Sequence, residues 1–253
     1  MTDTDPTARR SEAVRALVDR DPAGAADLYT VVGRGALAGL EAEATDREVL
    51  GADATYGGYG LRYLLLATFA YRAAGADRRA SLRAREGNAV AADYASLLDS
   101  EAERACCFEA MGDFGAAGGL GDDGADAYER ATELYREADD PDPLSRATEP
   151  LFEAVRLGAQ QAARNTTHAF DWDDLHGSDP SSGDYLARRA RVKRSRMPKV
   201  AETVSETGFL APPRGTTEHN NAVYVCPDCG RSEVNWIAGI EVCLDCDVRM
   251  REK

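Results

Sequence analysis

Four cysteines in the C-terminal part of the sequence have the residue type and spacing of a metal site. Cys226, Cys229, Cys243 and Cys246 form two Cys-x-x-Cys pairs with 13 residues between them. A gap of two residues lets both thiolates of a pair face one ion, and two pairs complete a tetrahedral site of four sulfurs. Because the four thiolates leave no position open for water or substrate, the motif predicts a closed, structural Zn²⁺ site.

The residues around the cysteines predict a small β-domain. Residues 233–242 have the pattern of a hairpin, and residues 223–225 lead into the first pair as another strand. Gly230 after the first pair permits a tight turn, whereas Asp247 stands at the matching place after the second pair and could loosen that turn. The pattern resembles a zinc ribbon, and we expect this domain to cover residues 222–253.

Iron is the alternative metal. Helical proteins similar to rubrerythrin also carry a closely spaced four-cysteine module, which holds redox iron. The bundles of those proteins contain a di-iron centre built from Glu-x-x-His pairs. The histidines of this sequence, His168, His176 and His219, are preceded three positions earlier by Asn, Asp and Thr. The sequence therefore offers no such centre, and the choice between zinc and iron stays open.

A short basic segment precedes the cysteines. Residues 188–199 carry seven cations and no acid: Arg188, Arg189, Arg191, Lys193, Arg194, Arg196 and Lys199. In one interpretation these side chains contact a partner, which is RNA, DNA or an acidic protein. In the other interpretation the segment is a helix that docks on the chain's own acidic residues. Both interpretations are open at this point.

The chain as a whole is acidic. Among 253 residues it has 44 Asp and Glu against 30 Lys and Arg, a formal charge of −14. Residues 1–180 hold 34 acidic and 18 basic side chains, whereas residues 181–214 hold three and eight. This charge argues against general binding to nucleic acids or anionic membranes, so any such contact must be local. Heavy acidity with only three lysines resembles the proteins of halophiles that accumulate salt.

No membrane or export signal is predicted. The first residues lack a basic region followed by an apolar stretch, as a secretory signal would have. The most apolar run, residues 61–74, is interrupted by two arginines and is shorter than the roughly 18 residues of a membrane span. We therefore expect a cytoplasmic protein, in which reduced cysteine pairs bind metal rather than form disulfides.

Residues 1–170 have a composition typical of helices, rich in Ala, Arg, Glu and Asp and poor in β-branched residues. Asp21 followed by Pro22 predicts a helix start, and that helix should run to about residue 44. The glycines of residues 56–60 predict a break before an apolar helix over 61–74. Further helices are expected at about 78–98, 101–112, 124–138 and 149–169.

One helix pair resembles a tetratricopeptide repeat. The small, aromatic and proline positions of the second helix are taken by Ala131, Tyr135, Ala138 and Pro143. Gly112 belongs to the preceding helix and lies 19 positions before Ala131, where the repeat has about 12, as in SNAP-type relatives. The resemblance implies a groove that binds a protein partner. A plain helical bundle is the alternative.

Two weaker patterns are interpreted as structural. The first is a crowded set of possible metal or acid–base residues: His168, Asp171, Asp173, Asp174 and His176. Aromatic and apolar residues alternate with them, as in a loop packed on the helices. The second is residues 119–124, which match GxGxxG but lack a preceding strand and contain two Asp, so they predict a turn.

The sequence thus predicts an all-α domain, a helical repeat or bundle, over residues 1–170, a linker with the basic segment over 171–221, and the ribbon. The predicted function is a non-enzymatic, protein-binding adaptor or scaffold with a structural zinc site. The alternative is a nucleic-acid- or ribosome-associated regulatory factor that holds phosphates with the basic segment and the ribbon. An enzyme that uses the residues between His168 and His176 is a third hypothesis.

Overall fold

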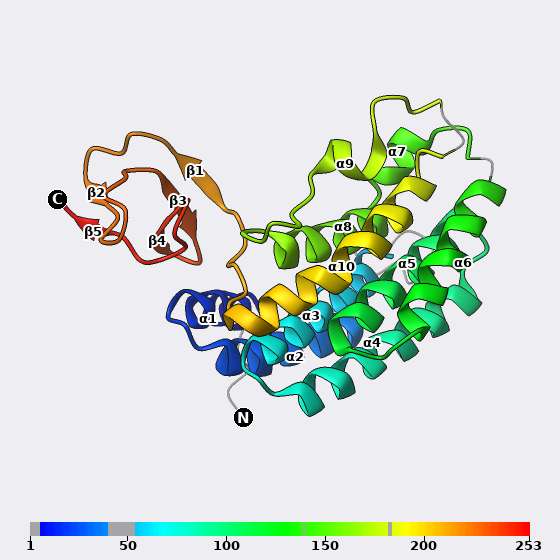
Figure 1. Cartoon of the computed structure of the whole chain (residues 1–253), viewed down its shortest axis with the longest axis horizontal. Helices are drawn as coiled ribbons and strands as arrows, with labels where there is room; N and C mark the ends of the chain where they lie inside the picture. Colours follow the sequence, from blue (N-terminus) through cyan, green and yellow to red (C-terminus); the bar gives the residue numbers. More distant parts are fainter. Residues whose placement is uncertain (1–5, 40–53, 139, 182–183) are drawn as a thin grey trace.

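The computed structural model describes residues 6–39, 54–138, 140–181 and 184–253. Within them, α-helices form a large body, and short strands form a small domain at one end of it (Figure 1). The predicted fold class, an all-α body with a small C-terminal β-domain, is confirmed. Among the described residues, no helix combines the length and apolar character that crossing a membrane requires.

The body is built from helices that pack in chain order around a central one. The helices are α1 (Pro6–Val18), α2 (Pro22–Leu37), α3 (Ala54–Ala73), α4 (Asp77–Leu97), α5 (Glu101–Gly118), α6 (Asp123–Glu137), α7 (Pro143–Ala147), α8 (Pro150–Ala163), α9 (Trp172–His176) and α10 (Ala187–Thr207). Each helix from α1 to α5 contacts the next, and α3 also contacts α5, α8 and α10. α3 is apolar on almost every face, which allows neighbours to surround it.

Capping residues set helix ends where the sequence predicts them. Asp21 accepts a hydrogen bond of 2.9 Å from the backbone N–H of Gly24, and Pro22 occupies the first turn of α2. This helix ends at Leu37, and the predicted extension over residues 40–44 lies outside the described residues.

The break predicted at residues 56–60 does not occur, because α3 begins at Ala54 and runs through these glycines. A Cβ on Gly58 would meet the Cα of Leu151 in α8 at 3.2 Å, and a Cβ on Gly60 would meet the side chain of Leu37 at 2.4 Å. The missing side chains let α2 and α8 approach α3 closely. This packing outweighs the low helix propensity of glycine.

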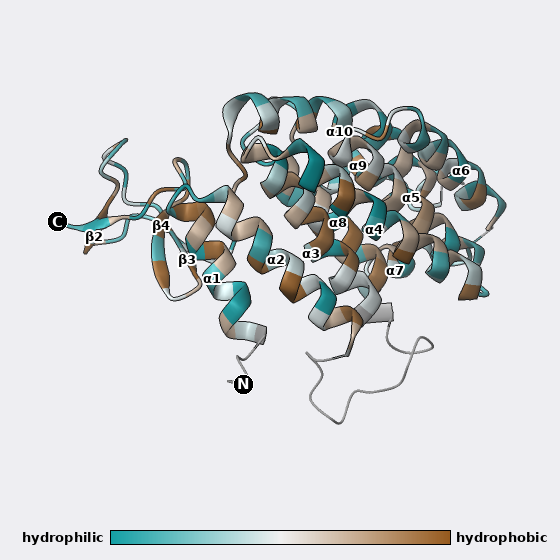
Figure 2. Ribbon diagram, turned by 90° about the horizontal axis from the view of Figure 1, so that it is seen from below, coloured by the Kyte–Doolittle hydropathy of each residue, from teal (hydrophilic) through white to brown (hydrophobic). Residues whose placement is uncertain are grey.

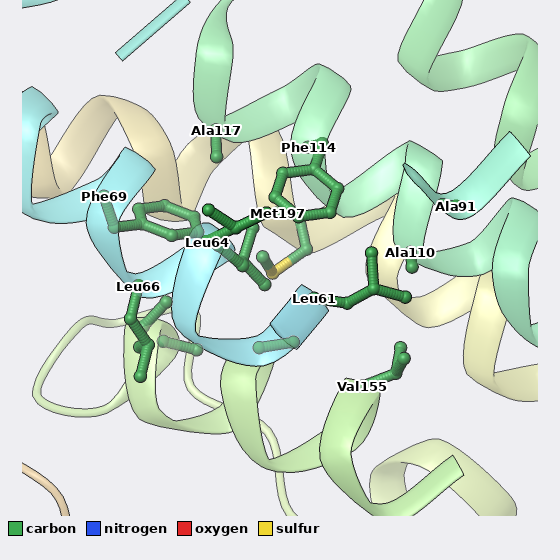
Figure 3. Packing of buried hydrophobic residues seen from close by; sticks show 14 of the residues in the cluster. Leu61, Leu64, Leu66, Phe69, Ala91, Ala110, Phe114, Ala117, Val155 and Met197 are labelled. Atoms are coloured by element: carbon green, nitrogen blue, oxygen red, sulfur yellow. The ribbon is translucent and has the colours of Figure 1, made fainter. Parts of the chain in front are cut away.

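The core lies around α3, where several helices contribute apolar side chains. In Figure 3, Leu61 and Leu64 of α3 face Phe114 of α5 and Met197 of α10, and all four are almost inaccessible to water. Many other core positions are alanines, such as Ala110, which bring the helix backbones close together. Burial of this apolar surface is the main source of stability for the body.

The basic segment lies in α10, which is part of the body. This helix packs across α3, α5, α6, α8 and α9 (Figure 1). Its buried face includes Ala190, Met197, Val200 and Val204, which recur at helical spacing among the cations. The structure thus differs from the predicted linker over residues 171–221, because the core of the body extends to Leu210.

Helices α5 and α6 form the hairpin that resembles a tetratricopeptide repeat. A Cβ on Gly115 would meet the Cα of Gly124 at 2.4 Å, so small residues determine how closely the two helices cross. Gly112 contacts the ring of Tyr128, and Ala131 is fully buried. The glycine-rich residues between the helices form a turn, as expected. Membership of the repeat family stays a prediction.

Five short strands form the C-terminal domain, which we call the ribbon (residues 216–253). β3 (Val234–Ile237) and β4 (Ile240–Cys243) form the predicted hairpin, β1 (Thr216–Glu218) pairs antiparallel with β3, and β2 (Tyr224–Val225) pairs with β5 (Arg251–Glu252). β1 precedes the predicted start at residue 222. Its three residues are polar and exposed, so the sequence has no alternating pattern there.

The ribbon is held against α1, as Figure 2 shows. Arg15 donates two hydrogen bonds, of 3.0 and 2.7 Å, to the carbonyl oxygen of Ala238 in the turn between β3 and β4. Arg249 donates two more to the carboxylate of Asp19, at 2.8 and 3.0 Å. Val18 packs against the apolar side of the hairpin. The first helix and the ribbon therefore stabilise each other's position.

Candidate metal centre

The four predicted cysteine ligands converge at one place in the ribbon. The sulfur atoms of Cys226, Cys229, Cys243 and Cys246 all lie within 4.8 Å of one another. The Sγ atoms of Cys229 and Cys243 are 3.7 Å apart. Four sulfurs at about 2.3 Å from a tetrahedral zinc ion are separated by about 3.8 Å, so the spacing of this donor set fits one ion.

The backbone turns around the two cysteine pairs match each other. The N–H of Gly230 donates to the carbonyl oxygen of Cys226 at 3.1 Å, and the N–H of Asp247 donates to that of Cys243 at 3.0 Å. Both residues have a left-handed φ, 73° for Gly230 and 52° for Asp247. Asp247 therefore forms the same turn as the glycine it replaces. Its buried carboxylate accepts a hydrogen bond from the Asn165 side chain of the body.

The thiols differ in their surroundings. Cys226 and Cys243 are buried against Val234 and Met250, whereas Cys229 is exposed. Burial raises the pKa of the Cys243 thiol to about 11, and a hydrogen bond from the backbone N–H of Arg231 lowers the pKa of Cys229. Since metal binds the thiolate forms, binding must release protons from this cluster.

Two cations of the basic segment lie in the interior of the body. Arg189 and Lys193 are fully buried on α10, one helical turn apart, and face Glu109 and Asp113, which are one turn apart on α5. Arg189 Nε lies 3.0 Å from the Glu109 carboxylate. Lys193 Nζ lies 2.6 Å from Glu109 and 2.7 Å from Asp113.

Tyrosines complete this buried network. The hydroxyl of Tyr135 donates to Glu109 at 2.6 Å, and that of Tyr128 donates to Asp113 at 2.5 Å. Burial favours the neutral form of Glu109, but the charges of Arg189 and Lys193 outweigh it and lower the pKa to about 2. Burial raises the pKa of Asp113 to about 6, so this group is also charged at neutral pH.

The other cations of the segment bind acceptors on the surface of the body. Arg191 pairs with Asp184 at 2.7 Å, Arg196 with Asp174 at 2.9 Å, Arg194 with Glu129, and Arg188 donates to the carbonyl oxygen of Asp174 at 2.8 Å. Within the described ranges, Lys199 is the only one of the seven whose side chain forms no ion pair or hydrogen bond. The segment therefore docks on the chain's own acidic residues, and Arg189 and Lys193 are inaccessible to a partner.

The residues between His168 and His176 do not form a metal site. Asp171 and Asp174 cap α9 reciprocally, and Asp174 also binds Arg196. His176 is buried between the rings of Trp172 and Tyr185. Among the described residues, the four cysteines are the one group of His, Cys, Asp or Glu side chains with ligand atoms close enough to share an ion.

The acidic partners of the buried cations were not predicted from the sequence. Glu109 and Asp113 have the same four-residue spacing as Arg189 and Lys193, which is the signal that could have paired the two helices. Comparisons of the chain with protein-family models, curated proteins and solved structures gave no match.

Proposed function

We propose that the chain is a cytoplasmic, non-enzymatic adaptor, in which a zinc-loaded ribbon contacts a protein partner and the helical body holds the ribbon in place. The observation that carries this proposal is the set of four cysteine sulfurs within 4.8 Å of one another. A site with four protein ligands has no position for a substrate, so its role is to stabilise the fold.

Zinc is the metal that we propose for this centre. The spacing of the sulfurs suits tetrahedral Zn²⁺, and four thiolates are a common ligand set of structural zinc. When bound, the ion would join the turn after β2 to the turn after β4 and thereby stabilise the ribbon. Elemental analysis of the purified chain should find one zinc per chain. One iron per chain would contradict this assignment.

The ribbon offers a partner an open sheet edge. Among the described residues, β1 pairs only with β3, and all three residues of β1 are exposed. The free edge of such a strand can accept a strand of another protein through backbone hydrogen bonds. The face of the body formed by α3, α5, α6 and α8 is covered by α10, which favours the ribbon as the contact surface.

Reconstitution tests the adaptor proposal. A partner captured from lysate at native salt is purified, and its affinity is measured for the intact chain, for Cys243→Ser and for Arg78→Gln. Arg78 is exposed on α4, outside the ribbon, and serves as the matched control. We expect a stoichiometric complex whose affinity falls about tenfold or more with Cys243→Ser only. An unchanged affinity for Cys243→Ser would contradict the role of the ribbon.

The nucleic-acid alternative requires cations that are already bound to acids. Arg191, Arg194 and Arg196 would have to exchange Asp184, Glu129 and Asp174 for phosphates. Sedimentation with ribosomes at native salt tests this directly. Co-sedimentation of the intact chain that is lost in Arg191→Ala/Arg194→Ala would contradict the adaptor proposal in favour of the alternative.

A further inference from the structure

Two neighbouring cavities lie where the helical body meets the segment that leads into the ribbon. Their volumes are about 220 and 310 Å³, and both are lined by Arg62, Gln161, Pro213 and Arg214. The smaller one extends to α1, α2 and the turn between β3 and β4. The larger one extends along α8 to Arg164 and to the residues before α9. Helices of the body, the segment that leads into the ribbon and the β3–β4 hairpin therefore all supply walls.

Arginines without acceptors face these cavities. In the described part of the chain, the guanidinium groups of Arg62, Arg164 and Arg214 form no ion pair and no hydrogen bond. Arg62 and Arg164 are nevertheless partly buried, and Nε of Arg62 and both Nε and Nη2 of Arg164 are shielded from water without a partner. Buried N–H donors of a charged group normally form hydrogen bonds, so the unpaired donors of Arg62 and Arg164 indicate that an acceptor is missing.

Other polar side chains also line the cavities. Tyr29 Oη and Gln161 Oε1 are also buried and lack a hydrogen-bond partner. Arg10 lines the smaller cavity and donates to the Tyr63 hydroxyl at 3.4 Å. Burial, opposed by the charge of Asp247 and assisted by that of Arg214, lowers the pKa of Arg164 to about 10.

The acids near the cavities are already occupied. Asp171 lines the larger cavity, and its Oδ1 accepts a hydrogen bond of 2.9 Å from the N–H of Asp174. Asp247 lies near Arg164 and Arg214, and its carboxylate is bound to Asn165 and almost inaccessible to water. The cavities thus hold a local excess of positive charge in a chain with a formal charge of −14.

We propose that the two cavities together bind a small phosphate ester. Arg62, Arg164 and Arg214 would bind the phosphate, because guanidinium groups offer paired N–H donors that match its oxygens. The rings of Tyr63 and Phe170 and the side chain of Leu66 line the remaining walls and suit an apolar or aromatic group. Walls from both body and ribbon limit the ligand to a small molecule.

A larger cavity in the body shows why charge pattern matters more than size. It measures about 480 Å³ and is lined by Arg72 and Arg194, but also by Glu202 and Glu206. Both arginines are bound elsewhere, Arg72 to Asp77 at 3.0 Å and Arg194 to Glu129. This balance of charges selects no class of ligand, in contrast to the cavities at the ribbon.

Calorimetric titration of the full-length chain at constant ionic strength tests the proposal. The ligands are adenosine monophosphate, inorganic phosphate, adenosine and succinate. We expect adenosine monophosphate to bind one site per chain, inorganic phosphate to bind about tenfold more weakly, and the other two not to bind. Arg62→Gln, Arg164→Gln and Arg214→Gln should each weaken binding of adenosine monophosphate about tenfold, whereas Arg78→Gln should leave it unchanged.

Four results would overturn the proposal. The first is an absence of binding by both phosphate compounds, and the second is an affinity unchanged by the cavity variants. The third is equal binding of succinate, which would indicate a general anion site. The fourth is equal binding of phosphate and its ester, which would make free phosphate the ligand. Because Arg214 is exposed and its side chain forms no hydrogen bond or ion pair with the described residues, Arg214→Gln keeps the test valid if Arg62→Gln or Arg164→Gln fails to fold.

Discussion

At the scale of residues, the buried charges between α5 and α10 are the most sensitive part of the body. Glu109 is inaccessible to water and binds Arg189, Lys193 and the hydroxyl of Tyr135. Transfer of these charges out of water costs free energy, which their mutual attraction offsets only while every partner is present. Loss of one member leaves the others buried and uncompensated.

Glu109→Gln should therefore lower the free energy of unfolding by about 3–5 kcal/mol. The matched control is Glu129→Gln, because Glu129 pairs with Arg194 on the surface, where both side chains are about half exposed. An exposed pair of this kind contributes about 1 kcal/mol or less. Urea unfolding followed by circular dichroism measures both values. Equal losses for the two variants would contradict the importance of the buried network.

His176 should make the stability depend on pH. Burial lowers its pKa from 6.5 to about 4, the charge of Arg189 acts in the same direction, and a hydrogen bond to the Trp172 carbonyl and the charge of Glu109 act against it. The unfolded state takes up the proton first as pH falls. The stabilisation by neutral His176 is therefore present above pH 6.5 and is lost as pH falls toward 4.

Between pH 7 and pH 5 this loss should amount to about 2 kcal/mol. His176→Gln removes the titrating group, so its free energy of unfolding should fall by about 2 kcal/mol less than that of the parent chain over the same interval. Urea unfolding at the two pH values gives the comparison, and Glu109 and Asp113 affect both chains alike. Parallel pH profiles for parent and variant would show that His176 is not responsible.

Spacing alone predicted that the four cysteines converge, because two Cys-x-x-Cys pairs suffice to surround an ion. It did not predict Glu109 and Asp113 as buried partners, because two acids four residues apart on a helix are more often solvated. The alternation of aromatic residues with His168 to His176 predicted a loop packed on the helices, and the structure buries His176 between aromatic rings.

At the scale of elements, close helix crossings depend on particular glycines. A Cβ on Gly115 would meet the backbone of Gly124 at 2.4 Å, so α5 and α6 would have to move apart. Gly115→Ala should lower the free energy of unfolding by roughly 1–3 kcal/mol. Gly35 in α2 is the control, since a Cβ there meets nothing within 4 Å.

Gly35→Ala should raise the free energy of unfolding by about 0.5–1 kcal/mol, because alanine favours a helix where no contact opposes it. Thermal unfolding monitored at 222 nm should give a lower melting temperature for Gly115→Ala and a higher one for Gly35→Ala than for the parent chain. A stabilising effect of Gly115→Ala would show that α5 and α6 do not cross as closely as described.

The same glycines explain where prediction of elements failed. The low helix propensity of glycine predicts a break at residues 56–60, but contacts with α2 and α8 keep this stretch helical. The packing of α10 against the body was also difficult to predict, because its many cations conceal the apolar residues that recur at helical spacing. Helix type and approximate position were predictable elsewhere because alanine-rich segments and capping residues act locally.

At the scale of the whole molecule, the metal should control the ribbon without controlling the body. Removal of the metal with a chelator should unfold residues 216–253, because the ribbon's small core is built around Cys226 and Cys243. The body has its own large core and should keep its helical signal. In a Trp172→Phe chain, the fluorescence of Trp236 reports on the ribbon alone.

We expect this fluorescence to shift on chelation and to return on addition of Zn²⁺, while circular dichroism at 222 nm changes little. Lower pH should have the same effect as the chelator, since protons compete with metal for the thiolates. A metal-free chain with unchanged Trp236 emission would contradict a structural role of the ion.

The contact between α1 and the ribbon also has a consequence for biosynthesis. The hydrogen bonds of Arg15 and Asp19 join residues more than 220 positions apart in the chain. α1 therefore leaves the ribosome well before its partners Ala238 and Arg249 are made. During elongation α1 can contact α2 and α3, but the side that faces the ribbon stays uncovered until the ribbon has been made and has folded. If the ribbon folds only with bound Zn²⁺, as proposed above, the supply of metal also determines when α1 gains these contacts.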